Sequence, residues 1–527
     1  MGKGASTVRN VFTVGAFTML SRVLGLVREV LQACLIGAGV AQSAFALAFA
    51  VPNMARKLFG EGALTAAFVP VFKGEVESAG LARAERLARA VLTTVMLVLA
   101  AIVGVALACL VAADAMSGWT AFAGDDRRSL ILSLCTILVP YMLAICGAAF
   151  GMGVLNALGR FRASSFMPVL LNIFWIAALA SLLPFKGLSV AASVRIVAGA
   201  ILVAGFVQMA FMLRCMARAG VCPRPLFAGW GDEKVRLVWR NLGIAALGAG
   251  AVQVNYMLDQ VLGQLASPWA AGVIGYAERL MDLPLGVIGV AFGTVLLPTF
   301  AGLFAKGDDE GAREALGSSV KSLMFVMLPA AAGLFALAPE VTRVVYERGE
   351  FDAAATVRVS RALAVYALGL GFFGLHKTLV PWFQAQNDMK TPLRVSVATV
   401  CMNAALNVLA VWLLPVEWRH VGLAASTVVC AFAGCSLLVA LARRRSGSLG
   451  LSRVVRHVLL SLAASAFMAA ALALVRPFAA RLPSIAALAA LVLLGAALYG
   501  AFSFALMPDQ FRALRDGLRR RRGARAH

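Results

Sequence analysis

Apolar segments long enough to cross a membrane constrain this chain more than any other feature of its sequence. They recur fourteen times along the 527 residues, and a spanning helix needs about 20 apolar residues. The chain is 61% hydrophobic and 14% charged, whereas soluble domains are about 25% charged. The sequence therefore predicts an all-α polytopic membrane protein with about fourteen transmembrane helices.

The expected helices leave little chain outside the membrane, so a separate soluble domain is not expected. Each one is an apolar window bounded by charge, proline or glycine. Their limits are 10–36, 41–72, 87–113, 129–156, 165–184, 190–214, 237–265, 269–304, 318–340, 356–384, 392–414, 421–442, 454–475 and 484–507.

The net charge of +23 is explained by basic loops beside anionic lipid headgroups. A nucleic-acid partner is not expected, because no basic groove interleaved with aromatic residues is visible. With the N-terminus placed inside, most loop and tail Lys and Arg residues fall on the inner side. The positive-inside rule then predicts a multi-pass protein of the cytoplasmic (inner) membrane with both termini in the cytoplasm.

A weak internal repeat suggests two related halves. Pro70 in AAFVPVF and Pro298 in TVLLPTF have the same separation as Ala157 in LNALGRFR and Ala385 in FQAQNDMK. Parallel repeats of this kind occur in transporters. The predicted organisation is an N-lobe of six helices (1–220), a C-lobe of six helices (221–445), two further helices (446–510) and a basic cytoplasmic tail (511–527).

Charged residues inside the expected spans are the main pointer to function. Such residues usually face a bundle interior or a water-filled cavity, although near a helix end they can extend to the headgroups, which stays open for Arg22 and Lys57. Neighbouring acidic residues would neutralise part of the charge in local pairs. The basic residues are Arg22, Arg28, Arg56, Lys57, Arg279 and Lys377, and the acidic ones are Glu29, Glu61, Glu278 and Asp282.

Helix-breaking residues accompany these charges. Pro52 lies in the middle of the second segment, and glycines lie on both sides of Glu61. Pro284 follows Arg279 by about one and a half turns. Interrupted helices beside charges, in corresponding places of two halves, indicate a transporter site.

Four stretches carry a resemblance to a known family. SRVLGLVREVLQACLIGAG, AFAVPNMARKLFGEGALTAAFVPVF, YAERLMDLPLGVIGVAFGTVLLP and FQAQNDMKTPLRV resemble the signatures of the MurJ (MviN) family of bacterial lipid II flippases, within the MATE-like exporter superfamily. The resemblance implies two six-helix lobes around a central cationic cavity. It also implies that the last two helices form a groove for a long isoprenoid tail.

The resemblance also implies a set of site residues. The arginines required in the family match Arg22, Arg28, Arg56 and Arg279, and its acidic E-G-A residue matches Glu61. Ser43 is a departure, because many relatives carry Asp there. The expected substrate-binding residues are Arg22, Arg28, Asn53, Arg56, Glu61 and Arg279, with Lys57, Glu278 and Lys377 as additional cavity residues.

The expected function is transport without catalysis. The resemblance implies movement of lipid II, the undecaprenyl-diphosphate-linked peptidoglycan precursor, from the inner to the outer leaflet by alternating access. Arginine forks suit its diphosphate. One alternative is an exporter of another polyprenyl-linked saccharide or of drugs. Another is a polyprenyl-dependent glycosyltransferase, which would need a catalytic carboxylate outside the membrane, for example Glu347, Glu350 or Asp352.

A second polar group suggests a sodium site. Asp259 lies in segment 237–265, Asn403 and Asn407 lie one turn apart in 392–414, and Ser426 and Thr427 follow in 421–442. Carboxylate, amide and hydroxyl oxygens suit a hard cation. The alternative is an interhelical hydrogen-bond cluster. No other cofactor is expected, because neither a P-loop lysine motif nor a CxxC pair occurs.

Overall fold

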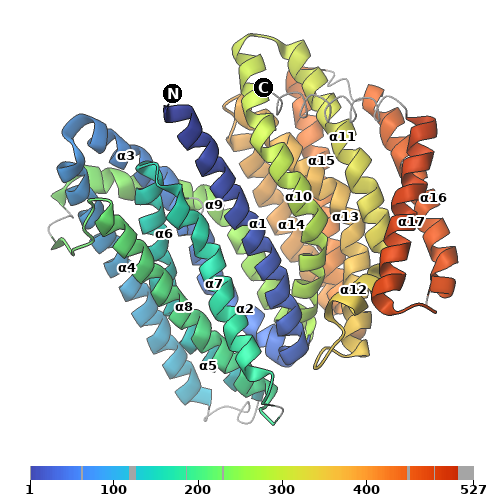
Figure 1. Cartoon of the computed structure of the whole chain (residues 1–527), viewed down its shortest axis with the longest axis horizontal. Helices are drawn as coiled ribbons and strands as arrows, with labels where there is room; N and C mark the ends of the chain where they lie inside the picture. The colour runs from blue at the N-terminus through green and yellow to red at the C-terminus, as the bar shows by residue number, and fades with distance from the viewer. Residues whose placement is uncertain are drawn as a thin grey trace. The chain divides into compact units, whose positions relative to one another are not determined.

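The computed structural model describes residues 2–60, 63–117, 126–185, 187–227, 231–447, 452–479 and 481–507. Within these ranges the chain forms helices joined by short turns, with no strand. The predicted all-α fold of a polytopic membrane protein is confirmed (Figure 1). Glu61 and the basic tail at 511–527 lie outside the described residues.

The contacts between helices divide the chain into two compact units. Unit 1 is Met1–Gly272 with Arg348–Asp352, and unit 2 is Val273–Glu347 with Ala353–His527. The helices of unit 1 are α1 (Gly2–Ile36), α2 (Val40–Ala55), the π-helix η1 (Arg56–Gly60), α3 (Ala63–Ala79), α4 (Leu81–Ser117), α5 (Asp126–Leu138), α6 (Tyr141–Ala157), α7 (Phe161–Leu182), α8 (Val190–Arg218) and α9 (Glu233–Ala266).

Unit 2 begins within α10. Its helices are α10 (Ala270–Ala305), α11 (Asp309–Ala336), α12 (Ala338–Tyr346), α13 (Ala353–Ala385), α14 (Lys390–Leu413), α15 (Val416–Ser446), α16 (Ser452–Ala479) and α17 (Ser484–Leu506).

Small residues set the packing of unit 1, where α6 lies against α8 and α1 lies against α7 (Figure 1). A Cβ at Gly147 of α6 would stand 2.7 Å from the Met209 sulfur of α8. A Cβ at Gly205 would stand 2.4 Å from the ring of Tyr141. Small residues let membrane helices approach closely, and dispersion contacts then stabilise the pair.

A buried ion pair holds α9 against α3 in unit 1. The Glu75 carboxylate is 3% exposed, and its two oxygens accept from the Lys234 ammonium at 2.7 and 2.6 Å. The Arg83 guanidinium lies 3.5 Å from the same carboxylate. The Lys234 side chain is 44% exposed, so removing it would leave the buried Glu75 carboxylate with only the longer contact to Arg83.

The five-residue segment Arg348–Asp352 belongs to unit 1 through backbone contacts with α1. The Glu350 N–H donates to the Cys34 carbonyl at 2.9 Å. Gly349 has φ +60°, and a Cβ there would lie 2.2 Å from the same carbonyl oxygen. Both the positive φ and the lack of space for a side chain therefore require glycine at this position.

Unit 2 is built on α11, which packs against both α13 and α16, while α17 packs against α16 (Figure 1). Trp382 is buried and meets the rings of Phe300 and Phe304 edge-on at 5.4 and 5.0 Å. The Tyr499 hydroxyl donates to the Phe325 carbonyl at 2.7 Å, so its polar end is satisfied at apolar depth.

All fourteen expected segments fall on helices, but three of them are interrupted. Segment 41–72 changes to a π-helix at Arg56, segment 129–156 breaks before Tyr141, and segment 318–340 breaks at Leu337. Pro140 explains the second break, since proline has no N–H to continue the ladder. Within the described residues, ten helices are long and apolar enough to span a membrane.

The number fourteen is therefore not confirmed. Helices α1, α2, α3, α9 and α10 are not among the ten. Most of the charges expected within spans lie on these helices and on η1. Helices α2 and α3 have 16 and 17 residues, which is shorter than a typical span of about 20 residues.

Candidate functional site

Arg28 is held by side chains of its own helix and of α7. Its Nη1 donates to Asn172 Oδ1 on α7 at 3.0 Å, and its Nη2 donates to Glu29 Oε1 at 2.5 Å. The two charged side chains are 15% and 13% exposed. The predicted local pairing of Arg28 with an acidic neighbour is therefore present.

Trp175 and Asn172 fix the plane of this guanidinium. The Arg28 Cζ lies 4.4 Å from the centroid of the Trp175 ring, which favours a cation over the aromatic face. Trp175 is wedged edge-on against Phe45 and Phe49 of α2 at 5.6 and 5.5 Å. Because the ring is held by α2, the guanidinium that stacks on it has little freedom to turn.

Asn172 in turn is positioned by α1. Its Nδ2 donates to the Ser21 carbonyl at 3.1 Å, so its oxygen points toward Arg28. A Cβ at Gly25 would lie 4.0 Å from Asn172 Nδ2, which is an ordinary contact, so this approach does not depend on the glycine. A single buried amide thus links two turns of α1.

Arg28 retains donors that these contacts do not use. A guanidinium has five N–H groups, and Asn172 and Glu29 take one each. Its Nε is buried without a hydrogen-bond partner in the described part of the chain. Most buried donors are satisfied, and an exception commonly marks a functional site.

Arg56 opens the π-helix η1, four residues after Pro52. Its Nε and Nη2 both donate to Asn53 Oδ1, at 3.2 and 3.1 Å. Pro52 lacks an N–H, so the helical ladder is already weakened where the geometry changes. Single-turn π-helices are frequent at functional sites. The structure therefore brings the predicted residues Asn53 and Arg56 together.

Lys57 lies beside Arg56 in the same π-helix. Its ammonium stands 4.9 Å from the ring centroid of Tyr256 on α9. Arg22 is exposed on α1, about 1.7 turns before Arg28. Both residues belong to unit 1, as do Arg28, Asn53 and Arg56.

The remaining predicted cavity residues belong to unit 2. Arg279 and Lys377 are exposed, and Glu278 is half-buried. The Tyr366 hydroxyl donates to Glu278 Oε1 at 3.3 Å. Their roles toward a substrate stay predictions.

The predicted sodium ligands are distributed over the two units. Asp259 lies on α9 in unit 1, where its Oδ2 accepts from Asn255 at 3.2 Å. Asn403, Asn407 and Thr427 lie in unit 2. Among the described residues, no three His, Cys, Asp or Glu side chains form a group that could hold a metal ion.

Asn403, Asn407 and Ser426 form a closed ring of hydrogen bonds between α14 and α15. Asn407 donates to Asn403 Oδ1 at 2.9 Å, Asn403 donates to Ser426 Oγ at 3.3 Å, and Ser426 donates to Asn407 Oδ1. All three are at most 4% exposed. The Thr427 hydroxyl instead donates to the Leu423 carbonyl at 3.2 Å.

Ser43 occupies a packed junction of three helices. It is fully buried, and the Gln264 amide of α9 donates to its carbonyl at 2.6 Å and its hydroxyl at 3.0 Å. The Gln264 side-chain oxygen accepts from Arg127 of α5 at 2.6 Å. The Gln264 side chain therefore joins α2 and α5 to α9, with Ser43 as its acceptor on α2.

The FQAQNDMK motif forms the turn between α13 and α14. Asn387 has φ +58°, and Asp388 accepts from the N–H groups of Lys390 and Thr391 at 3.1 and 3.0 Å, which caps α14. Partial burial raises the pKa of Asp388, but the hydrogen bonds from Thr391 and the charge of Arg445 outweigh it and leave the pKa below its usual value.

Glu347 and Glu350, which were considered as catalytic carboxylates of a glycosyltransferase, make contacts that hold the fold together. The Glu347 carboxylate accepts from the Thr356 hydroxyl at 2.7 Å and lies 3.5 Å from Arg343 Nε. The Glu350 backbone is tied to α1. These contacts do not present Glu347 as a general base.

Asn172 and Trp175 were not among the residues predicted from the sequence. The available signal was one amide in the apolar run VLLNIFWIAAL, because a lone Asn in a spanning helix usually bonds to another helix. Which helix it meets depends on tertiary packing, and so does the partner of its oxygen.

Comparison with known sequences agrees with this geometry. The family profile described as "Lipid II flippase MurJ" matches residues 32–493. The chain is 35% identical over 77% of its length to a probable lipid II flippase MurJ of Rhizobium tropici, covering 75% of that protein. It is 34% identical over 81% to a probable lipid II flippase MurJ of Vibrio cholerae, covering 81% of it.

Solved structures share the fold. A lipid II flippase MurJ in an inward closed conformation matches with a TM-score of 0.76 at 20% identity, over 94% of this chain and 99% of that one. An inward-facing multidrug resistance transporter of the MATE family matches with a TM-score of 0.65 at 15% identity, over 83% and 98%. By its sequence and the extent of the match, the chain belongs to the lipid II flippase MurJ family.

Proposed function

We propose that the chain flips lipid II from the inner to the outer leaflet of the cytoplasmic membrane by alternating access. The observation that carries the proposal is the Arg28 guanidinium, which is oriented by Asn172, Glu29 and Trp175 and keeps unused donors. Family membership supports the identity of the substrate. The substrate is moved without chemical change.

The chemistry follows from the substrate's diphosphate. An anion cannot enter hydrocarbon unaided at any useful rate, because the loss of hydration is too costly. Arginine remains charged when desolvated and bonds phosphate oxygens in pairs. Arg28 is pre-oriented, so little entropy is lost when the anion binds, and Arg56 offers a second guanidinium on the same unit.

The proposed energy source is the membrane potential. A carrier with uncompensated arginines would return toward the negative cytoplasmic side after releasing its anion. The potential contributes about 2.3 kcal/mol per charge per 100 mV. No nucleotide is needed in this scheme.

The proposed orientation places both termini in the cytoplasm, as the loop charges indicate. Single cysteines at Lys306 and Gly187, in a variant without the nine native cysteines, report on it. An impermeant thiol reagent applied to intact cells should label Gly187→Cys and spare Lys306→Cys. The reverse pattern would overturn the orientation.

Complementation tests the function directly. A bacterial strain depleted of its own lipid II flippase should grow when this chain is expressed at normal level. Purified protein in liposomes should move labelled lipid II to the opposite leaflet, and collapsing an imposed potential should slow that movement. Normal expression with neither growth nor lipid II movement would refute the proposal.

The second candidate is an exporter of another polyprenyl-linked saccharide or of a drug. It is favoured by the fold shared with the multidrug resistance transporter of the MATE family. The same liposomes, loaded with a polyprenyl-linked saccharide that lacks the peptide or with a lipophilic cation, separate the two. Faster movement of either compound than of lipid II would favour this candidate.

A further inference from the structure

The turn between α6 and α7 in unit 1 has the same backbone hydrogen bonds as the turn between α13 and α14 in unit 2. The N–H groups of Gly159 and Arg160 donate to carbonyls three and five residues earlier, at 3.0 and 2.8 Å. Asn387 and Asp388 make the same two bonds, at 3.0 Å each. Gly159 and Asn387 also share a positive φ, of +73° and +58°. The internal repeat of the sequence therefore extends to the backbone of these turns.

One position of the turn carries opposite charges in the two units. In unit 2 it holds Asp388, whose carboxylate accepts from the first two N–H groups of α14 and pairs with Arg445 near the end of α15. In unit 1 it holds Arg160, and within the described residues no side-chain hydrogen bond caps the N-terminus of α7. Arg160 cannot supply the anion that Asp388 supplies in unit 2.

A cavity of about 360 Å³ lies at this turn of unit 1, and we call it the α7 cavity. Arg160 and Arg162 line it at the start of α7, and Arg218 lines it from the last turn of α8. Arg160 Nη1 donates to the Arg218 carbonyl at 3.3 Å, which ties the turn to α8. The lining contains no Asp or Glu. Three guanidinium groups therefore border one space without an acidic residue.

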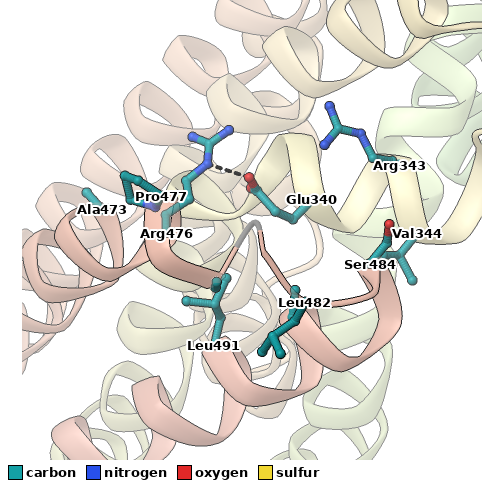
Figure 2. Close-up of a pocket in the computed structure, with 11 residues that line it drawn as sticks. Glu340, Arg343, Val344, Ala473, Arg476, Pro477, Leu482, Ser484 and Leu491 are labelled. Carbon is teal, nitrogen blue, oxygen red and sulfur yellow. Dashed lines mark hydrogen bonds and ion pairs between the residues drawn. The ribbon is translucent and has the colours of Figure 1, made fainter.

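Arginines that line a cavity in unit 2 are balanced by carboxylates. Figure 2 shows Arg476 bonded to Glu340 beside α12. Arg343 lines the same cavity, and its Nε lies 3.5 Å from Glu347 Oε2. In the described part of the chain, the three arginines of the α7 cavity make no such ion pair. The α7 cavity is therefore positively charged.

The α7 cavity lies at the edge of the membrane. The apolar spans around it end at Ala157 and Arg218 and begin at Phe161. Phe161 lines the cavity and is 41% exposed. Asn172, which holds Arg28, lies eleven residues further along α7, or roughly 16 Å along the axis. A ligand of the α7 cavity would therefore lie at headgroup depth, apart from the Arg28 cluster.

We propose that the α7 cavity binds a phosphomonoester group, in the place that the Asp388 carboxylate takes in unit 2. A phosphomonoester carries about −1.5 to −2 charges at pH 7 and three acceptor oxygens, so it would neutralise most of the lining. Arginine bonds phosphate oxygens in pairs, and the first N–H groups of a helix attract phosphate. The volume is typical of small-molecule sites, which hold about 300–1,000 Å³. The carrier is therefore a phosphorylated small molecule or a lipid headgroup.

The test titrates the purified full-length chain in a neutral detergent with two phosphomonoesters. Glycerol 3-phosphate lacks acyl chains, and dihexanoyl phosphatidic acid carries them. Native mass spectrometry and the thermal midpoint report binding, because a ligand of the folded state raises its apparent stability. Both compounds should bind, and the tighter one identifies the source as soluble or lipid. Dihexanoyl phosphatidylglycerol, a phosphodiester of lower charge, should bind about tenfold more weakly than the phosphatidic acid.

Arg160→Asp is the most informative variant, because it places the residue of unit 2 in the turn of unit 1. The new carboxylate should cap α7 and abolish binding, and the ligand-free protein should be at least as stable as wild type. The double variant Arg162→Gln/Arg218→Gln should weaken binding about a hundredfold, since two charge-assisted contacts are lost. Arg214→Gln is the control, because Arg214 is exposed one turn earlier on α8 and does not line the cavity.

Four results would overturn the proposal. They are failure of both phosphomonoesters to bind wild type, unchanged binding in the two cavity variants, phosphatidylglycerol binding as tight as that of phosphatidic acid, and an equal loss in Arg214→Gln. The last result would assign the effect to general surface charge. None of these measurements depends on lipid II transport, so the proposal can fail while the transport function stands.

Discussion

Each unit contains one cluster of buried polar side chains. The two clusters use similar residue types for opposite purposes. Around Arg28 in unit 1, an amide, a carboxylate and an indole orient a cation whose Nε has no partner among the described residues. Around Asn407 in unit 2, two amides and a hydroxyl donate and accept in a closed ring. In the first cluster a buried donor stays available to an anion, whereas in the second no buried side-chain nitrogen or oxygen of Asn403, Asn407 or Ser426 lacks a partner among the described residues.

The difference shows how a polar group at membrane depth can be assigned to transport or to structure. A neutral ring whose bonds are mutually satisfied stabilises helix contact and offers little to a ligand. A cation with more donors than acceptors must find further partners or carry the cost of burial. The presence of a buried polar atom without a partner, more than burial itself, separates the two clusters.

Replacing Arg28 should give the largest effect. Arg28→Ala should abolish complementation, and Arg28→Lys should lower lipid II movement at least about tenfold, because an ammonium cannot reproduce the planar fork. Arg195→Lys is the matched control, since Arg195 bonds to the neutral Ser133 hydroxyl. Full growth of Arg28→Ala at wild-type expression would remove the distinction between the clusters.

Asn172→Ala should reduce transport less, by about fivefold, because it removes a positioning contact worth roughly 1 kcal/mol and leaves the charge in place. The loss should appear as weaker lipid II binding with the maximal rate little changed. Asn156→Ala is the control, because that amide accepts from Ser164 in the same unit. A proportional fall in both variants would indicate a general effect of folding.

Ser426→Ala should act on stability alone. Opening the ring leaves buried amide groups without a partner, which costs about 1 kcal/mol in a membrane protein. The thermal midpoint should fall by a few degrees, while lipid II movement per folded molecule stays at the wild-type level. Ser436→Ala, at an exposed position on the same helix, should change neither. A transport defect in Ser426→Ala without a stability loss would place the ring in the transport site.

Exchanging sodium for potassium should give the smallest effect. The Asn403 and Asn407 amides bond each other and Ser426, so we expect the thermal midpoint to be the same in both salts. Asp259→Asn should leave this indifference unchanged. A sodium-specific rise that disappears in Asp259→Asn would establish the ion site considered from the sequence.

The sequence predicted those parts of the fold that depend on residues close together in the chain. Hydropathy placed the expected segments on helices, because the cost of burying backbone in lipid forces each apolar run to be helical, but it did not foresee the three interruptions. The pairing of Arg28 with Glu29 was also foreseeable, since the two residues are adjacent. The bend expected at Pro52 stays a prediction, since α2 continues through Pro52 to Ala55 before the π-helix begins at Arg56.

Contacts between distant segments were not predictable in the same way. Asn172 reaches Arg28 because α7 packs against α1, and neither stretch of sequence indicates that the two helices meet. The bond from Asn403 to Ser426 depends on how α14 and α15 are rotated about their axes. A shift of one residue in either register would have turned these amides to lipid.

The short segment Arg348–Asp352 has a consequence for the order in which the protein is made. Unit 1 otherwise ends at Gly272, yet its α1 carbonyl at Cys34 is paired with Glu350. The ribosome adds roughly 5–20 residues per second, so unit 1 waits several seconds for its last five residues. A gene cut after Gly272 would yield an N-terminal product with that carbonyl uncovered. Co-expression of the other fragment would have to supply the missing piece.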